Sequence, residues 1–276
     1  MATMSDFAGG DTGYLRTVQY ADSTRLRQRV DLHRRYGTAP VSWFPWLARQ
    51  VAWTSGGSVL EVGCGGGWMW DEAAADLPGN LLVTLTDVSP GMVAEAEGRA
   101  QAGGFHVQPC VADARALPLR GGRYDVVIAA FVLFHLPDPA AGVAELARMV
   151  KPDGVVLVAT AGAAHLRELW EIRSEVFGGP PTSATVDAFG TESGGRLLAE
   201  RFGSVTWRPY PDELVCGEPD AVVAFMTSSP PGESADDEQL GRLRAAVDRR
   251  FEAGGGTLRV TKETGVFVCR QPRPDR

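Results

Sequence analysis

The sequence has few of the residues that mark disulfide-rich, zinc-binding or membrane-spanning proteins. Its four cysteines are widely separated, and no two of them form a C-x-x-C pair. This spacing argues against a zinc site and against a disulfide framework, so we expect no metal and reduced thiols. No stretch approaches the roughly 20 apolar residues that cross a bilayer, and the first 13 residues lack a basic segment followed by an apolar run. We therefore expect a cytoplasmic protein without membrane contact.

Positive charge is also scarce. The net charge is -7 with a pI near 5.2, and only Lys151 and Lys262 are lysines. An acidic chain repels a phosphate backbone, so we expect no nucleic-acid partner. The composition is that of a globular protein, with 44% hydrophobic and 22% charged residues. At 276 residues, one structural domain with appended segments is the simplest expectation.

Short apolar runs alternate with helical patterns through the middle of the chain. This rhythm predicts an α/β fold, in which a mostly parallel sheet is covered by helices on both faces. The expected strands are 58–62, 81–86, 106–111, 125–131, 155–160, 204–207 and 258–270. Helical patterns are expected within 14–51 and at 165–177, 219–226 and 240–252, and Ser89 is expected to cap a further helix that contains Pro90.

These patterns divide the domain into four parts. Residues 1–51 are expected to form an N-terminal helical cap, and 52–160 the ligand-binding core. Residues 161–200 break the rhythm with a Gly/Pro/Ser/Thr-rich stretch and are expected to be an insertion that helps to build a substrate pocket. Residues 201–276 are expected to complete the sheet.

The strongest motif is a buried strand that runs into a glycine-rich turn, Glu61-Val62-Gly63-Cys64-Gly65-Gly66-Gly67. Glycine lets the backbone turn sharply and approach a ligand closely, while the following helix offers free amide donors. The acidic residue that precedes the turn, Glu61, has two readings. It binds a donor group of the ligand, such as an amino-acid ammonium, or it anchors the loop.

A second carboxylate follows at the end of the next strand. Asp87 lies 24 positions after Gly63, where a carboxylate in such folds meets the ribose hydroxyls of a nucleoside. The same spacing suits a dinucleotide-dependent oxidoreductase. However, Trp68 stands where the dinucleotide fingerprint requires a third glycine, and this favours S-adenosylmethionine as the ligand.

With these motifs the chain resembles class I S-adenosylmethionine-dependent methyltransferases. The glycine turn matches the family's E/D-x-G-x-G-x-G loop, and Thr86-Asp87-Val88-Ser89-Pro90-Gly91-Met92 matches its ribose-binding strand end. Cys110 to Ala114 resembles the third element, whose aspartate reads adenine, and Tyr124 to Leu136 resembles the fourth strand and its exit. The resemblance implies a doubly wound, Rossmann-like sheet of seven strands, mostly parallel, with an antiparallel C-terminal strand.

The resemblance also implies which residues contact S-adenosylmethionine. In the core these are Glu61, Gly63, Cys64, Gly65, Gly67, Asp87, Val88, Met92, Asp113, Ala114, Ala130 and Phe131. The segment from Tyr20 to His33 is similar to the cap of bacterial small-molecule methyltransferases. By that similarity Tyr20 and Arg29 approach the cofactor, with Tyr14 and His33 as lesser candidates, unless these residues only dock the cap. Arginine can hold a carboxylate by paired hydrogen bonds.

The expected reaction is methyl transfer to a small molecule by in-line displacement, which leaves S-adenosylhomocysteine. Such catalysis depends chiefly on alignment, so a base is optional. His135 is the first candidate base and His165 the second, although either imidazole can simply shape the pocket. The segment at Ala129 to Val132 lacks the D/N-P-P-Y/F motif of amino-methylating DNA enzymes.

The expected acceptor is a secondary metabolite with a planar or aromatic part, because enzymes with this cap serve natural-product tailoring. Candidate pocket residues are Trp43, Trp68, Trp170 and Phe189, each of which can equally belong to the core. A cyclase-like reaction on the same scaffold, a nicotinamide-dependent oxidoreductase and a regulatory binding module remain the alternatives. The oligomeric state stays open, since the N-terminal helix can pack on its own domain or on a second copy.

Overall fold

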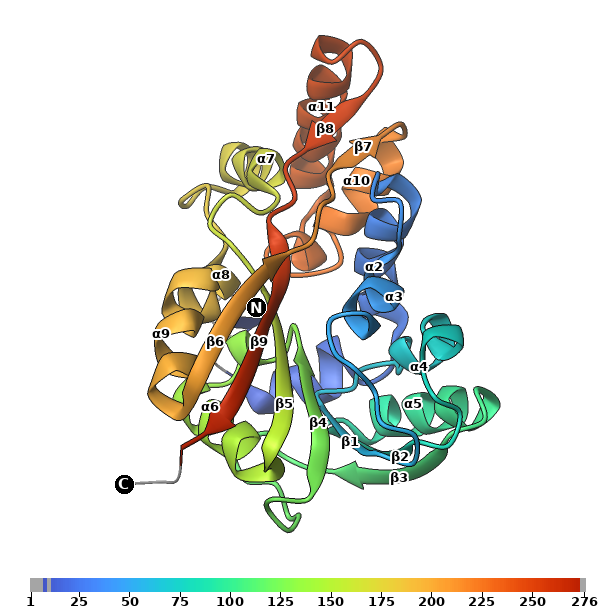
Figure 1. Ribbon diagram of the computed structural model, residues 1–276. Coiled ribbons are helices and arrows are strands. Elements are labelled where there is room, and N and C mark those ends of the chain that lie inside the picture. The colour runs from blue at the N-terminus through green and yellow to red at the C-terminus, as the bar shows by residue number, and fades with distance from the viewer. Residues whose placement is uncertain (1–6, 9–10, 274–276) are drawn as a thin grey trace.

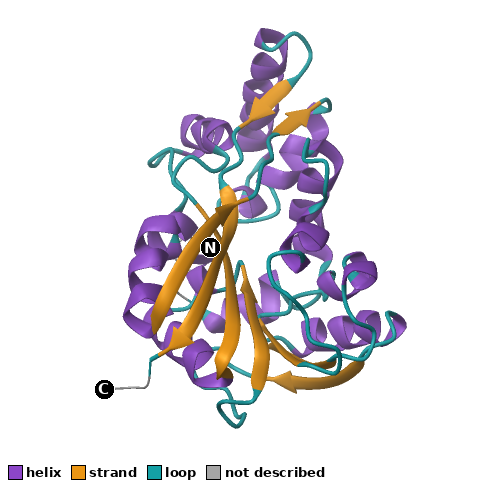
Figure 2. Ribbon diagram, in the orientation of Figure 1, coloured by secondary structure: helices purple, strands orange, loops and turns teal. Residues whose placement is uncertain are grey.

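A seven-stranded sheet forms the centre of the molecule. The computed structural model describes residues 7–8 and 11–273, and the sheet has the strand order β3-β2-β1-β4-β5-β9-β6 (Figures 1 and 2). The strand β9 pairs antiparallel with both β5 and β6, while β1 to β5 pair in parallel. The expected doubly wound fold with an antiparallel C-terminal strand is therefore confirmed. The strands of this sheet are β1 (Ser58–Val62), β2 (Leu82–Asp87), β3 (His106–Val111), β4 (Tyr124–Ala130), β5 (Val150–Ala161), β6 (Phe202–Pro209) and β9 (Thr264–Pro272).

Neighbouring residues on the central strands of the sheet enter two different hydrophobic cores. On β1, Val59 packs into one cluster and Leu60 into the other, because successive side chains of a strand point to opposite faces. The first face is covered by helices α3 (Trp43–Ala48), α4 (Met69–Glu72) and α5 (Pro90–Ala102). The second is covered by α6 (Pro139–Met149), α8 (Ala184–Phe189) and α9 (Thr191–Arg201). Both faces of the sheet are therefore buried.

A smaller lobe with a third hydrophobic core stands at the end of the sheet where β5 finishes (Figure 1). It combines segments that are far apart in sequence, and a two-stranded sheet joins its parts. Its elements are α2 (Thr24–Tyr36), α7 (Arg167–Phe177), β7 (Leu214–Cys216), α10 (Pro219–Met226), α11 (Asp237–Ala253) and β8 (Leu258–Val260). The C-terminal segment therefore completes the sheet with β6 and β9 but also builds this lobe, which differs from the simple completion that the sequence predicted.

The N-terminal segment contains less helix than the sequence predicted. Between residues 14 and 51 the chain breaks at 20–23 and again at 37–42. Short helical turns are α1 (Thr12–Tyr14), η2 (Leu15–Gln19), η3 (Ala74–Asp76), η4 (Leu133–His135) and η5 (Gly232–Ser234). Ser89 caps α5 as predicted, because its hydroxyl accepts the Met92 amide at 3.3 Å. Within the described residues, no helix is both long and apolar enough to span a bilayer.

Candidate active site

The glycine turn after β1 is held in a conformation that only glycine tolerates. Gly63, Gly65 and Gly67 have φ values of 68°, 50° and 72°, which strain any residue with a side chain. A Cβ on Gly63 would lie 2.3 Å from the Val132 side chain, and one on Gly67 would lie 2.4 Å from the Ala96 backbone. The turn thus passes directly over the exit of β4 and the flank of α5, leaving its backbone open to a ligand.

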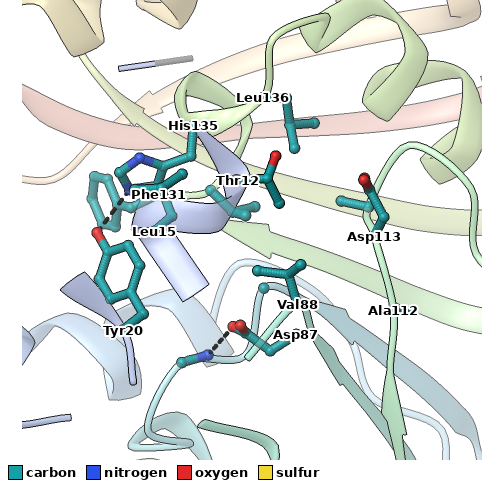
Figure 3. Close-up of a pocket in the computed structure, with 14 residues that line it drawn as sticks. Thr12, Leu15, Tyr20, Asp87, Val88, Ala112, Asp113, Phe131, His135 and Leu136 are labelled. Atoms are coloured by element: carbon teal, nitrogen blue, oxygen red, sulfur yellow. Dashed lines mark hydrogen bonds between the residues drawn. The ribbon is translucent and has the colours of Figure 1, made fainter. Parts of the chain in front are cut away.

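Asp87 fixes the same turn from the neighbouring strand. One carboxylate oxygen accepts the Gly65 amide at 3.0 Å (Figure 3). The other accepts the Ser89 amide at 2.9 Å. Burial raises the pKa of Asp87 above its usual value, although these amide bonds oppose the shift. Its carboxylate is therefore rigidly placed beside the glycine turn.

Glu61 lies beneath the turn and not on its surface. Its side chain is buried and accepts the indole N–H of Trp70 at 2.6 Å. Burial raises its pKa to about 8. This placement agrees with the loop-anchor reading of Glu61, and Glu61 does not line the cavity above the turn.

A cavity of about 690 Å³ opens above the turn. Residues that the sequence singled out for cofactor binding and that line it are Tyr20, Gly63, Gly65, Asp87, Val88, Asp113, Ala114 and Phe131 (Figure 3). The lining also includes Thr12, Leu15, Ala112, Val132, His135 and Leu136. Ala112 and Val132 adjoin motif positions, so proximity in sequence could have found them, whereas Thr12 and Leu15 carry no motif signal. A carboxylate at the strand end, small apolar walls and a glycine cradle fit S-adenosylmethionine.

Other residues predicted for the cofactor lie outside this cavity. Cys64 and Met92 are buried, and Ala130 packs against the core. Gly67 faces Ala96. Arg29 lines a second, larger cavity, where its guanidinium donates to the Ser228 carbonyl at 2.9 Å. These five positions therefore differ from the prediction of direct lining.

His135 joins the two cavities, because it lines both together with Tyr20 and Phe131. Its Nδ1 lies 2.7 Å from the Phe7 carbonyl oxygen, and its Nε2 lies 2.8 Å from the Tyr20 hydroxyl. Because a carbonyl oxygen only accepts, Nδ1 carries the hydrogen and Nε2 accepts from tyrosine. Burial lowers the pKa of His135 to about 4, so the imidazole is neutral near pH 7.

Asp113 keeps its charge at the opposite wall. Arg115 donates to it at 2.6 Å, and this contact lowers the pKa of the Asp113 carboxyl below its usual value. The side chain is a third exposed, so the ionised carboxylate is available to an amino group in the cavity. The position of Asp113 agrees with the predicted hydrogen bond between its carboxylate and the adenine amino group.

The larger cavity measures about 1570 Å³ and lies between the sheet and the lobe. Trp43 and Trp170, two of the predicted pocket residues, line it. The second candidate base, His165, also lines it, as does His33, and a role for either histidine in catalysis or cofactor binding stays a prediction. Its walls come from the N-terminal cap, from the start of the 161–200 segment and from the chain around β9. It is therefore large enough for a substrate beside the smaller cavity.

Trp68 and Phe189 do not line either cavity, which corrects the prediction for them. The guanidinium groups of Arg34 and Arg99 lie 5.1 and 5.4 Å from the Trp68 ring, and this side chain is 8% exposed. Phe189 is fully buried in the core under α9, where its carbonyl accepts the Thr160 hydroxyl at 2.6 Å. Both side chains serve packing.

Comparison with known proteins supports the domain type. Residues 59–154 match a family model described as a methyltransferase domain. A ubiquinone biosynthesis O-methyltransferase of Sodalis glossinidius is 38% identical over 38% of this chain and 41% of its own. A ubiquinone/menaquinone biosynthesis C-methyltransferase of Geotalea uraniireducens is 29% identical over 42% of this chain and 50% of its own. The chain thus spans about half the length of the curated relatives it matches.

Solved structures share the fold over more of the chain. The YcgJ protein of Bacillus subtilis superposes with a TM-score of 0.56 at 16% identity, covering 83% of this chain and 97% of that one. A Haemonchus contortus phosphoethanolamine N-methyltransferase, solved with S-adenosylmethionine, gives 0.58 at 17% identity, covering 99% of this chain and 61% of that one. The family model and the curated relatives thus support a methyltransferase domain within this chain, and the solved structures show that the chain shares their fold.

Proposed function

We propose that the protein transfers a methyl group from S-adenosylmethionine to a small acceptor with a planar or aromatic part. The observation that carries this proposal is the pair of adjoining cavities, which share Tyr20, Phe131 and His135. One cavity has the glycine turn and Asp87 of a cofactor site, and the other is larger and ring-lined. We also propose a cytoplasmic setting in natural-product biosynthesis, which the resemblance of the cap supports.

The residues of the smaller cavity bind and orient the donor. Asp87 faces the sugar hydroxyls, Asp113 faces the adenine amine, and Gly63 and Gly65 leave room for the amino-acid part. S-Adenosylmethionine supplies a methyl group that its sulfonium already activates. The protein therefore contributes chiefly alignment, which can lower a barrier by roughly 7 to 11 kcal/mol.

The larger cavity holds the acceptor against the wall that it shares with the cofactor cavity. Phe131, Phe134 and Trp43 place rings along its wall, and Tyr210 and Trp170 add two more. Aromatic walls favour planar ligands through stacking and edge contacts. We therefore propose that the acceptor lies flat among these rings, with its reactive atom next to the wall shared with the donor.

His135 can take a proton from the acceptor at Nε2. The Phe7 carbonyl holds the Nδ1 hydrogen, which leaves the Nε2 lone pair directed at Tyr20. An acceptor hydroxyl can pass its proton to Nε2 directly or through the tyrosine oxygen. The low pKa of the imidazole makes it a weak base, so this role suits an acidic hydroxyl better than an alcohol.

Calorimetry with S-adenosylmethionine tests the cofactor assignment. Asp87→Ala removes the carboxylate that faces the sugar, and we expect affinity to fall by about ten- to a hundredfold, as for hydrogen bonds to a charged group. Asp71→Ala changes an exposed carboxylate on α4 and is the matched control. No binding heat with the wild-type protein would refute the proposal, as would equal affinity of the Asp87 variant.

Incubation with a labelled methyl donor and aromatic acceptors tests the reaction itself. Label in the product supports methyl transfer. Turnover of the acceptor without label would instead favour a cyclase-like reaction on the same scaffold. Binding of a nicotinamide cofactor in place of S-adenosylmethionine would favour an oxidoreductase.

A further inference from the structure

The larger cavity has an aromatic end next to the cofactor cavity. Tyr20, Phe131 and His135 form the shared wall. From Phe131 a row of rings leads away from it, since Trp43 lies 5.1 Å from Phe131 and 5.2 Å from Tyr210, centroid to centroid. This row provides a continuous apolar wall for a planar molecule.

The row of rings ends at a buried charge pair. The Lys262 ammonium lies 5.0 Å from the Tyr210 ring and pairs with Asp212. The two side chains are only 7% and 1% exposed, yet both line the cavity. A lysine buried to this degree requires partners for all of its donors.

Asp212 is already satisfied by the protein, whereas Lys262 is not. One oxygen of Asp212 accepts the amides of Thr38 and Ala39 at 2.7 and 2.9 Å, and the other accepts Lys262. An ammonium has three donors, and Asp212 is its one hydrogen-bond partner among the described residues. The cation therefore keeps donors for a ligand.

Two neutral imidazoles stand at the same end. The rings of His33 and His165 stack 5.9 Å apart at an interplanar angle of 13°. Each Nδ1 is buried without a hydrogen-bond partner in the described part of the chain. Burial and the nearby Lys262 charge lower the pKa of both histidines. Each ring can therefore donate one hydrogen bond and can take up a proton when an anion approaches.

Further unpaired polar atoms line this cavity. The Trp43 indole N–H and the Thr264 hydroxyl are buried and have no partner among the described residues. The other carboxylate on the wall, Glu72, pairs with Arg34. Buried polar groups are normally paired, and leaving one unpaired is unfavourable. Donors thus exceed free acceptors around the cavity.

The backbone holds these groups in place before any ligand binds. The chain at 162–166 is bonded to the chain at 261–263, because the Gly162 amide donates to the Glu263 carbonyl and the Leu166 amide to the Thr261 carbonyl, both at 2.8 Å. The Trp170 indole N–H also donates to the His165 carbonyl at 2.7 Å. His165 and Lys262 therefore lie on two segments that are fastened together. A preorganised site loses less entropy on binding.

We propose that the acceptor carries a carboxylate, which Lys262 and the His33–His165 pair bind while its planar part lies along Phe131, Trp43 and Tyr210. This inference rests on the proposed methyl transfer and names the acceptor class for it. The near end supplies ring contacts and the far end supplies donors. A planar acid satisfies both ends at once, whereas a neutral planar molecule leaves the ammonium and imidazoles without acceptors.

Paired probes of equal shape test this proposal. The protein is first saturated with S-adenosylhomocysteine. This complex is then titrated with 2-naphthoate or, separately, with 2-naphthalenemethanol, and binding is followed by tryptophan fluorescence. The wild-type protein is expected to bind the carboxylate about tenfold or more tightly than the alcohol. Lys262→Met should abolish this preference, and Lys262→Arg should keep most of it. Lys151→Met is the matched control, since Lys151 is the other lysine and pairs with Asp125 away from the cavity.

A second variant tests the proposal independently, in case Lys262→Met does not fold. His165→Phe keeps a ring beside His33 but removes its nitrogen atoms, and we expect the preference to fall about threefold or more. Calorimetry in buffers of different ionisation enthalpy should also show proton uptake when the carboxylate binds, and less uptake in this variant. Equal affinity for the two probes, failure of both to bind at millimolar concentration, or a preference that neither variant changes would overturn the proposal.

The titration with S-adenosylhomocysteine keeps the two proposals separate. If that ligand fails to bind, the proposed function fails. If it binds and the probes show no carboxylate preference, methyl transfer stands and only the acidic acceptor is rejected.

Discussion

Glu61 illustrates how a motif residue can act without touching the ligand. Its carboxyl lies under the glycine turn, bonded to the Trp70 indole N–H, and its raised pKa of about 8 keeps it protonated near pH 7. A neutral carboxyl resembles the amide of glutamine in shape and in hydrogen-bonding groups. The shape of the turn therefore depends on a buried hydrogen bond and not on a negative charge.

Glu61→Gln is expected to leave cofactor affinity nearly unchanged. Below pH 4.5, where the Glu61 carboxyl is protonated in the folded and the unfolded chain, it should also leave the free energy of unfolding nearly unchanged, and at pH 7 the Gln variant should be the more stable protein. Glu61→Ala should lower the free energy of unfolding below pH 4.5 by about 1–3 kcal/mol, because the Trp70 N–H loses its partner. The contribution of Glu61 to stability should fall as the pH rises from 4.5 toward 8, since folding favours its protonated form, so the free-energy difference between the Gln variant and the wild-type protein should grow over this range. Denaturant unfolding and calorimetry measure these effects. A large loss of affinity in Glu61→Gln with unchanged stability would instead favour an ammonium contact.

Helix α5 connects the cofactor site to the N-terminal cap. Glu95 accepts the Ser23 amide at 3.0 Å and the Ser23 hydroxyl at 2.6 Å. The start of the same helix presses on the cap, because a Cβ on Gly91 would lie 2.1 Å from the Ala21 carbonyl oxygen. Gly98 lies on the same helix, but a Cβ there would meet no atom within 4 Å. The two glycines therefore differ in whether a side chain would clash.

Gly91→Ala is expected to displace the segment 20–23 and to weaken cofactor binding, because Tyr20 lines the cofactor cavity. Overpacking of this kind costs about 1–3 kcal/mol. Gly98→Ala on the same helix should instead stabilise the protein by about 0.5–1 kcal/mol. Hydrogen exchange at residues 20–24 measures the displacement. Equal exchange in the two variants would show that the cap does not depend on this contact.

The sequence correctly predicted those strands and helices that are determined by short, local patterns of residues. The apolar runs before Gly63 and Asp87 form strands that end where the motifs begin, and Pro219 opens a helix whose bounds agree with the sequence. The run 258–270 reads as one strand but divides into β8 and β9, which belong to different sheets. Hydrophobic alternation does not encode the partner of a strand. The sequence did not predict helices α8 and α9, because α8 contains the β-branched residues Thr185 and Val186 and α9 contains serine and two glycines, all of which have weak helix propensity.

The same limit applies to the site. Asp87 and the glycines follow from a short motif, whereas Lys262 and His165 meet only because two distant segments are joined by backbone bonds. The spacing of residues in the sequence does not indicate that Lys262 and His165 lie close together.

At the scale of the whole molecule, the cap and the lobe bring three half-buried histidines to the wall of one cavity. His33, His135 and His165 come from three separate segments and all line the larger cavity, while His106 is exposed on β3. Burial lowers the pKa of each of the three, to about 4 for His135 and about 3 for His165. In the absence of a bound anion, this arrangement therefore favours neutral imidazoles.

This predicts that stability falls as the pH drops below about 6.5, the usual histidine pKa. Between that value and the lowered pKa of the folded state, the unfolded chain binds a proton that the folded chain does not, so each buried histidine lowers the free energy of unfolding by about 1.4 kcal/mol per pH unit. His165→Phe should remove one such contribution from the slope measured by denaturant unfolding between pH 6.5 and 4.5, and His106→Gln should remove none. Carboxylates with lowered pKa values, such as Asp125 and Glu168, weaken the fold in the same direction but are common to both variants. Identical slopes for the wild-type protein and His165→Phe would mean that the lobe opens and hydrates this imidazole before the sheet unfolds.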